Sequence, residues 1–214
     1  MRFASRQDAG ERLGQYLRKR GLEADLVLGL PRGGVVVAAE VARLLQLPLD
    51  VLVVRKIGHP WHREFAVGAM AEPDIVMVNE ATLKEVPVPR GQLNKVVAEE
   101  MSRLREYRSH FHSSSSPSLG DKSVLLIDDG LATGATAEAA VLSAKRQRAR
   151  RVTMAAPVAS MGAIDRLRRV ADEVVALAAD PCFQAVGQYY DEFSQTSDDE
   201  VIALLQTAAM RPGK

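Results

Sequence analysis

The chain of 214 residues contains little cysteine, few aromatic side chains and no excess of charge. Its single cysteine, Cys182, excludes an internal disulfide and is compatible with a reducing compartment. Because 28 basic residues face 27 acidic ones, no global field attracts nucleic acid. The amino-terminal residues lack the apolar core of a signal peptide, and no apolar stretch approaches membrane-spanning length. These absences predict a cytoplasmic protein that binds neither nucleic acid nor membranes.

Segments with the patterns of strands and helices alternate along the chain. The expected strands are residues 26–30, 50–54, 75–78, 124–127, 152–156 and 173–177. The expected helices are residues 6–20, 33–45, 92–107, 135–147, 162–169 and 198–209. This alternation predicts an α/β fold with a doubly wound, mainly parallel sheet and helices on both faces. A serine-rich run at residues 113–120 predicts a surface linker.

The most informative segment reads VLLIDDGLATGAT, from residue 124 to residue 136. Its first four residues fit a strand buried on both faces, so Asp128 and Asp129 fall at the carboxyl end, where open α/β sheets bind ligands. Two carboxylates can accept the hydroxyls of a ribose. The following residues combine small size with hydroxyl groups and can surround a phosphate: Gly130, Ala132, Thr133, Gly134, Ala135 and Thr136. The segment therefore predicts a site for ribose 5-phosphate.

This segment resembles the signature of the type I phosphoribosyltransferases, which bind 5-phosphoribosyl 1-pyrophosphate (PRPP) through an apolar strand, two acidic residues and Thr-Gly-x-Thr. An acidic pair that only holds Mg²⁺, as in receiver domains, is the alternative, but it would lie early in the chain and need no such loop. The RKIG and AVGQYY segments resemble those of an uncharacterised prokaryotic subgroup. The resemblance implies transfer of ribose 5-phosphate from PRPP to a nitrogenous base with release of pyrophosphate. It also implies a homodimer and Mg²⁺, oriented through water by Asp128 and Asp129.

A second loop, GLPRGG at residues 29–34, follows the first expected strand. Its glycines let the backbone approach a ligand, and a helix begins behind it, which suits a diphosphate. A turn with ordinary capping chemistry would look similar. By resemblance, Arg32, Gly33 and Gly34 bind pyrophosphate, and the bond between Pro31 and Arg32 is expected to be cis.

Two cations, Arg55 and Lys56, end the second expected strand and should reach the same edge of the sheet. A cation at this edge can stabilise charge on the departing pyrophosphate, and the resemblance makes Lys56 a candidate catalytic residue with Asp128 and Asp129. Solvated charges at the end of a strand are the alternative interpretation.

Near the carboxyl end, Phe183, Tyr189 and Tyr190 concentrate aromatic rings in a chain that is only 5% aromatic. By resemblance they are candidates to stack on the base, in a small hood above the sheet. Packing of the hood or of a dimer contact is the alternative role.

The resemblance predicts one phosphoribosyltransferase domain across residues 1–214. It comprises a core at about 22–180, an inserted flexible loop and helix at about 57–121, and a hood with a helix at about 181–210. The sequence identifies neither the acceptor base nor a general acid or base. The main alternative is a regulator that senses PRPP or a nucleotide without turnover, because its PRPP motif would be the same. The cations on the side of the leaving group favour an enzyme.

Overall fold

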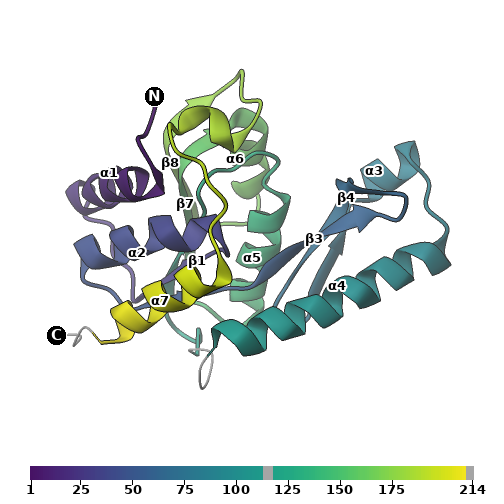
Figure 1. Ribbon diagram of the computed structural model, residues 1–214, viewed down its shortest axis with the longest axis horizontal. Coiled ribbons are helices and arrows are strands. Elements are labelled where there is room, and N and C mark those ends of the chain that lie inside the picture. Colours follow the sequence, from purple (N-terminus) through teal and green to yellow (C-terminus); the bar gives the residue numbers. More distant parts are fainter. Residues whose placement is uncertain (113–117, 211–214) are drawn as a thin grey trace.

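The computed structural model describes residues 1–112 and 118–210, apart from the side chain of Glu64. Residues 113–117 of the predicted serine-rich linker therefore lie outside the described residues. Within them, the chain forms a five-stranded parallel sheet in the order β2-β1-β6-β7-β8 and a three-stranded antiparallel sheet in the order β3-β4-β5 (Figure 1). The parallel strands are β1 (Leu26–Gly29), β2 (Leu49–Val51), β6 (Ser123–Ile127), β7 (Arg151–Ser160) and β8 (Glu173–Asp180).

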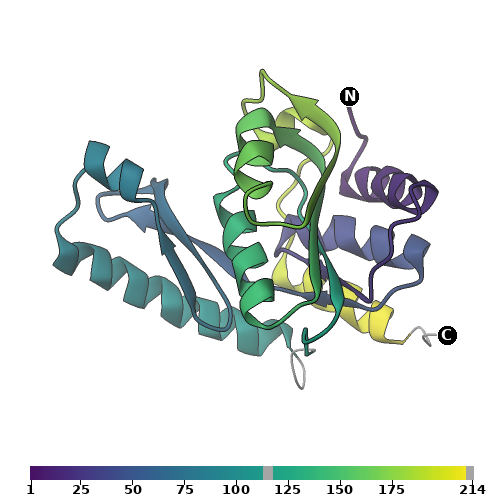
Figure 2. The same cartoon turned by 180° about the vertical axis from the view of Figure 1, so that it is seen from behind.

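Helices cover both faces of the parallel sheet, as opposite views show (Figures 1 and 2). Side chains along β6 alternate between the faces, so Leu125 packs towards α1 and α2, whereas Leu126 packs against α5 and α6. Burial on both faces explains the unbroken apolar runs of these strands. The predicted α/β fold with a mainly parallel sheet is confirmed. The four helices are α1 (Arg6–Lys19), α2 (Gly33–Leu45), α5 (Ala135–Arg146) and α6 (Met161–Leu167).

The direction of winding reverses between β1 and β6. Helix α2 connects β1 to β2 on one side, whereas α5 and α6 connect β6 to β7 and β8 on the other side. The loops that follow β1 and β6 therefore diverge and leave a crevice at the carboxyl ends of the strands. These loops carry the two segments, residues 29–34 and 128–136, that the sequence pattern predicts to bind phosphates.

The strand expected at residues 50–54 is two strands in different sheets. Strand β2 ends at Val51, and β3 (Val54–His59) begins the antiparallel sheet. At the junction, the N–H of Val53 donates to Glu72 Oε1 at 2.7 Å instead of to a neighbouring strand. Because the junction itself is buried and apolar, the sequence pattern shows no break there.

The inserted region also differs from the expected flexible loop and helix. It contains β4 (His62–Ala71), which pairs with both β3 and β5 (Ile75–Val78). The helices α3 (Glu80–Glu85) and α4 (Arg90–Phe111) follow, and α4 packs its apolar stripe on the antiparallel sheet. Residues 54–111 form an arm that extends away from the parallel sheet (Figure 1).

A buried ionic cluster joins the root of this arm to the parallel sheet. Glu72 is buried between β4 and β5, and its Oε1 lies 3.0 Å from Nε2 of His112, which follows α4. Asp50 Oδ1 lies 3.4 Å from His112 Nδ1, and Arg108 Nε lies 3.2 Å from Glu72 Oε2. Burial lowers the pKa of His112, but the hydrogen bonds to Asp50 and Glu72 outweigh it and raise the pKa to about 9. The imidazole is therefore a cation at neutral pH.

The carboxyl-terminal segment returns to the parallel sheet through a short 3₁₀ helix (Val186–Tyr189) and α7 (Asp198–Ala209), which packs on α2. The amino terminus holds the hood in place, because the N–H of Phe3 donates to the carbonyl of Tyr189 at 2.8 Å. In the described part of the chain, no helix has the length and apolar character that crossing a membrane requires.

Candidate functional site

A cavity of about 680 Å³, the crevice site, opens between the loops that follow β1 and β6. The first loop contributes Leu30 and Pro31, and the second contributes most of residues 128–136. The arm supplies the facing wall from β3, β4 and α4, and Val186 of the hood completes the lining. Segments that are remote in the sequence therefore meet where the strand order reverses.

The acidic pair lines the crevice site, and both residues are partly buried. Asp128 Oδ1 accepts the N–H of Asp129 at 2.9 Å, and Asp129 Oδ2 accepts Arg6 Nε at 2.7 Å. Burial raises the pKa of Asp128 well above its usual range, the charge of Asp129 raises it further, and Lys56 opposes both. Burial also raises the pKa of Asp129, against the hydrogen bond from Arg6. Raised carboxyl pKa values in a crevice mark a candidate ligand site.

The glycines that begin α2 lie directly behind the acidic pair. A Cβ atom on Gly33 would overlap Asp129 Oδ2, and a Cβ atom on Gly34 would lie 2.9 Å from Asp128 Cα. The two aspartates therefore require glycine at both positions, beyond the expected need to admit a ligand. The sequence pattern did not reveal this reason, because it depends on a contact between two distant loops.

The loop that carries these glycines only partly faces the cavity. Pro31 lines the crevice site, whereas Arg32, Gly33 and Gly34 do not. The Nη1 atom of Arg32 lies 3.9 Å from Asp198 Oδ1, at the start of α7. The bond between Pro31 and Arg32 is cis, as predicted.

The small-residue loop after the acidic pair is anchored to β7. The N–H of Leu131 donates to the carbonyl of Val158 at 2.9 Å, and Ser160 Oγ donates to the carbonyl of Ala132 at 2.6 Å. Gly134 has a φ of 72°, which favours glycine, and it is the N-cap of α5. The first amides of α5 lack partners within the helix and carry its partial positive charge. The predicted phosphate-binding residues that line the cavity are Gly130, Ala132, Thr133, Gly134 and Thr136, whereas Ala135 lines a neighbouring hollow.

Cationic side chains of the arm form the facing wall. Arg55 and Lys56 reach the cavity from β3, an antiparallel strand, and not from the end of a parallel strand as expected. Buried Glu100 binds Arg55 at 2.7 Å and Arg103 at 2.8 Å. The sequence analysis did not identify three charged lining residues, namely Arg63 of β4 and Glu100 and Arg103 of α4. The two on α4 were missed because charges at helical spacing resemble a solvated surface.

The hood aromatics pack against one another and against Phe3, which is the alternative role that the sequence left open for them. Tyr189 is 5% exposed and Tyr190 is 3% exposed, and Phe183 packs on Tyr189 with ring centroids 5.2 Å apart. Burial raises the pKa of Tyr190, whose hydroxyl donates to the carbonyl of Asp129 at 2.6 Å. None of the three lines the crevice site, to which the described hood contributes Val186 instead.

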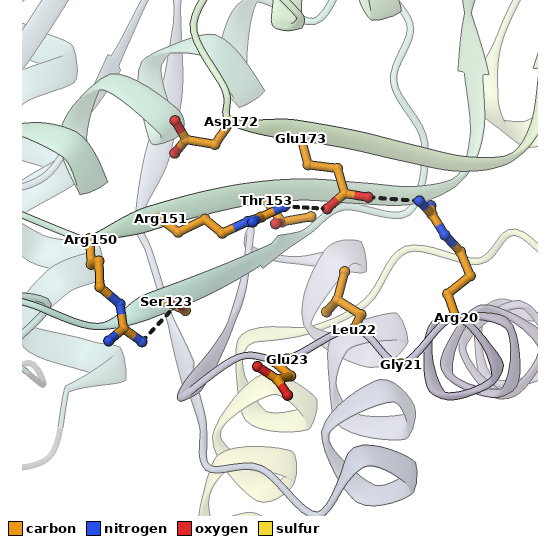
Figure 3. A pocket seen from close by; sticks show the side chains of 10 residues that line it. All are labelled: Arg20, Gly21, Leu22, Glu23, Ser123, Arg150, Arg151, Thr153, Asp172 and Glu173. Carbon is orange, nitrogen blue, oxygen red and sulfur yellow. Dashed lines mark hydrogen bonds and ion pairs between the residues drawn. The ribbon is translucent and has the colours of Figure 1, made fainter.

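A hollow of about 810 Å³ lies among residues at the amino ends of the parallel strands (Figure 3). Three of its charged side chains are paired with one another, since Glu173 binds Arg20 at 2.9 Å and Arg151 at 3.0 Å. Open α/β sheets bind ligands at the opposite, carboxyl edge. The crevice site, and not this hollow, is therefore the candidate functional site.

The parallel sheet, the acidic pair and the small-residue loop define the type I phosphoribosyltransferase fold. Residues 4–192 match the family described as the phosphoribosyl transferase domain. The crystal structure of TT1426 from Thermus thermophilus is similar, with a TM-score of 0.80 and 42% identity over 97% of this chain and 99% of that chain. The structure of AQ2163 from Aquifex aeolicus shares the fold alone, with a TM-score of 0.51 and 12% identity over 82% of this chain and 73% of that one.

A Mycobacterium tuberculosis protein named "Putative phosphoribosyl transferase Rv0571c" is 42% identical over 207 residues, which are 96% of this chain and 47% of that protein. The chain therefore spans about half the length of the curated relatives it matches. The chain belongs to the phosphoribosyl transferase family.

Proposed function

We propose that this protein transfers ribose 5-phosphate from PRPP to a nitrogenous base and releases pyrophosphate. One observation carries the proposal beyond family membership: the acidic pair, the loop before α5 and the cations of the arm line a single cavity. PRPP requires these three kinds of group, because it carries ribose hydroxyls, a monophosphate and a diphosphate. Their meeting at the point where the strand order reverses matches the ligand position of open α/β sheets.

In this proposal, Asp128 and Asp129 accept hydrogen bonds from the ribose hydroxyls, and residues 130–136 bind the 5'-phosphate. The amides at the start of α5 supply positive charge, and Thr133 and Thr136 add hydroxyl donors. Burial raises the pKa of both carboxyl groups, because it removes water from the ionised pair. Ribose hydroxyls that donate to the pair, and Mg²⁺ that accompanies the anionic PRPP, offset the cost of ionising the two carboxyl groups.

On the side of the leaving group, Lys56 and Arg55 stabilise the charge that develops on pyrophosphate as its bond to the anomeric carbon breaks. The 2.7 Å contact with Glu100 holds Arg55 in place before the substrate arrives. The amides of Gly33 and Gly34, at the positive end of α2, bind the diphosphate from the other side. Arg32 joins them by turning away from α7.

Mg²⁺ is the proposed cofactor. Among residues 1–112 and 118–210, no group of three or more aspartate, glutamate, histidine or cysteine side chains forms a candidate metal site. Asp128 and Asp129 nevertheless suit Mg²⁺, which favours carboxylate oxygens, retains several waters and binds substrate phosphates. They would hold it through water. When bound, Mg²⁺ neutralises charge on the diphosphate.

Pyrophosphate release tests the proposal. The protein is incubated with PRPP, Mg²⁺ and each member of a panel of purine and pyrimidine bases, and we expect release with at least one of them. Asp128→Asn and Asp129→Asn should abolish that release while the thermal unfolding transition is retained. Asp121→Asn is the matched control, because Asp121 is exposed and has a φ of 60°, which asparagine adopts readily.

A regulator that senses PRPP or a nucleotide without turnover is the second candidate. One observation favours it: Glu100 pairs with both Arg55 and Arg103 and offsets part of their charge, which weakens the positive field at the leaving group. Tight PRPP binding without pyrophosphate release from any base would establish this function. Release that Lys56→Gln reduces, without loss of PRPP binding, would exclude it.

We further propose that residues 1–214 form one phosphoribosyltransferase domain that is cytoplasmic and assembles as a homodimer. Family resemblance supports the dimer, and symmetric dimers are common among soluble proteins. Sedimentation equilibrium over a range of protein concentrations tests the assembly, and a monomeric mass throughout would contradict it.

A further inference from the structure

We propose that Arg6 is a positioning residue that holds Asp129 in the orientation that PRPP binding requires. This inference rests on the proposed function. Arg6 Nε donates to Asp129 Oδ2 at 2.7 Å, and the two side chains are only 11% and 15% exposed. A charge-assisted hydrogen bond this well protected from water fixes the carboxylate far better than a surface pair does.

Arg6 is itself fixed by two further contacts. Its Nη1 donates to the carbonyl of Ser194 at 2.7 Å, and its guanidinium carbon lies 3.9 Å from the ring centroid of Phe193. A planar guanidinium that stacks on a ring and donates in two directions has one favourable orientation. The backbone of Asp129 is held as well, by the 2.6 Å hydrogen bond from Tyr190 to its carbonyl. Helix α1 and the hood therefore fix the same aspartate.

The ion pair packs closely against the backbone of Gly33. A Cβ atom on Gly33 would lie 2.6 Å from Arg6 Nε and would overlap Asp129 Oδ2. The ion pair is thus packed against the first residue of α2, which belongs to the proposed pyrophosphate loop. One guanidinium connects the ribose side of the crevice site, the pyrophosphate loop and the hood.

Arg6 acts through Asp129, because Asp129 lines the crevice site and Arg6 does not. Arg12 of the same helix offers a matched comparison. It binds Asp8 at 2.9 Å with side chains that are 49% and 27% exposed, in a pair that touches no residue of the cavity. Arg12→Gln removes one positive charge from α1, as Arg6→Gln does, but it leaves the contacts of Asp129 unchanged.

The test is a double-mutant cycle on PRPP affinity, measured by titration calorimetry with Mg²⁺. We expect Arg6→Gln to weaken PRPP binding roughly ten- to a hundredfold, the range typical for loss of a partner that orients a ligand-binding group. In an Asp129→Asn background the same change should have little further effect, since the group it positions is already altered. Arg6→Lys should restore part of the affinity, and Arg12→Gln should leave it within about twofold.

Each outcome decides the inference. Equal loss from Arg6→Gln with and without the Asp129 carboxylate would show that Arg6 acts through the fold, and it would overturn the positioning role. If the wild type binds PRPP and Arg6→Gln binds it equally well, the positioning role is overturned, while the proposed function stands. A wild-type protein that binds no PRPP would contradict the proposed function and this inference with it. If Arg6→Gln loses its cooperative melting transition, Arg6→Lys decides the question: weakened affinity at an unchanged melting temperature supports the role, and unchanged affinity rejects it.

Discussion

Replacement of His112 by glutamine should remove a pH-dependent part of the stability of this protein. His112 lies between Asp50 and Glu72 at the root of the arm, where its two ring nitrogens face carboxylate oxygens at 3.4 Å and 3.0 Å. Both nitrogens donate only when the ring is protonated. Glutamine can retain one hydrogen bond but carries no charge.

The shift in the pKa of His112 sets the size of the effect. The rise from 6.5 to about 9 is a difference of 2.5, and at 1.36 kcal/mol for each unit it corresponds to about 3 kcal/mol. The side chain is 7% exposed, so solvent screening reduces this value little. Because the folded state raises the pKa, the contribution is complete below about pH 6.5 and is lost as the pH rises through about 9.

Urea unfolding of the wild type and of His112→Gln between pH 6 and 10 measures this contribution. The wild type should be more stable by up to about 3 kcal/mol at pH 6, and the difference should narrow as the pH approaches 10. His110→Gln is the control, because His110 is an exposed histidine of the same helix end. Stability curves of the wild type and His112→Gln that run parallel across this range would refute the reasoning.

Two further predictions concern the acidic pair. Gly33→Ala should weaken PRPP binding by displacing the Asp129 carboxylate. Gly91→Ala, in open space on α4, should leave PRPP binding unchanged and stabilise the fold by about 0.5 to 1 kcal/mol. Equal PRPP affinities of the two variants in calorimetry would show that neighbouring atoms shift to absorb the predicted overlap. Asp128→Asn should raise the melting temperature of the protein without Mg²⁺ or PRPP. The folded state raises the pKa of Asp128, so the wild type loses stability relative to its unfolded state as the pH rises above about 4. The gain from the substitution should therefore grow with pH over this range. A melting temperature that falls at pH 7 would mean that the buried carboxylate stabilises the fold.

Much of the parallel sheet was predictable, because its signals are local. The apolar run of β6 indicates burial on both faces, and the small residues that follow indicate a loop before a helix. The acidic pair could be placed at the carboxyl edge of the sheet for the same reason. The position of β6 between β1 and β7 is visible only in the structure, because the inserted arm separates β6 from β2 along the chain.

The arm was predicted less well. Strand β4 contains Gly68, two alanines near its end and irregular pairing with β3 around Gly58, so it lacks the regular alternation that marks a strand. Buried Glu100 falls among the many charges of α4, and periodicity alone assigns such a residue to the surface. The concentration of aromatic residues in the hood was visible in the sequence, but composition does not show which ring faces are packed against neighbouring side chains.

The sequence by itself determined the fold class, the family resemblance and the location of the proposed phosphate-binding loop, since strand burial, helix starts and turn residues depend on neighbours along the chain. Only the tertiary structure decided which charges meet. Three features depend on contacts between segments that lie apart in the sequence: the ion pair of Arg6 with Asp129, the requirement for glycine at position 33, and the charged state of His112. Such contacts arise when helices and loops pack into a low-dielectric interior, where distances of a few ångströms set both the geometry and the protonation of a site.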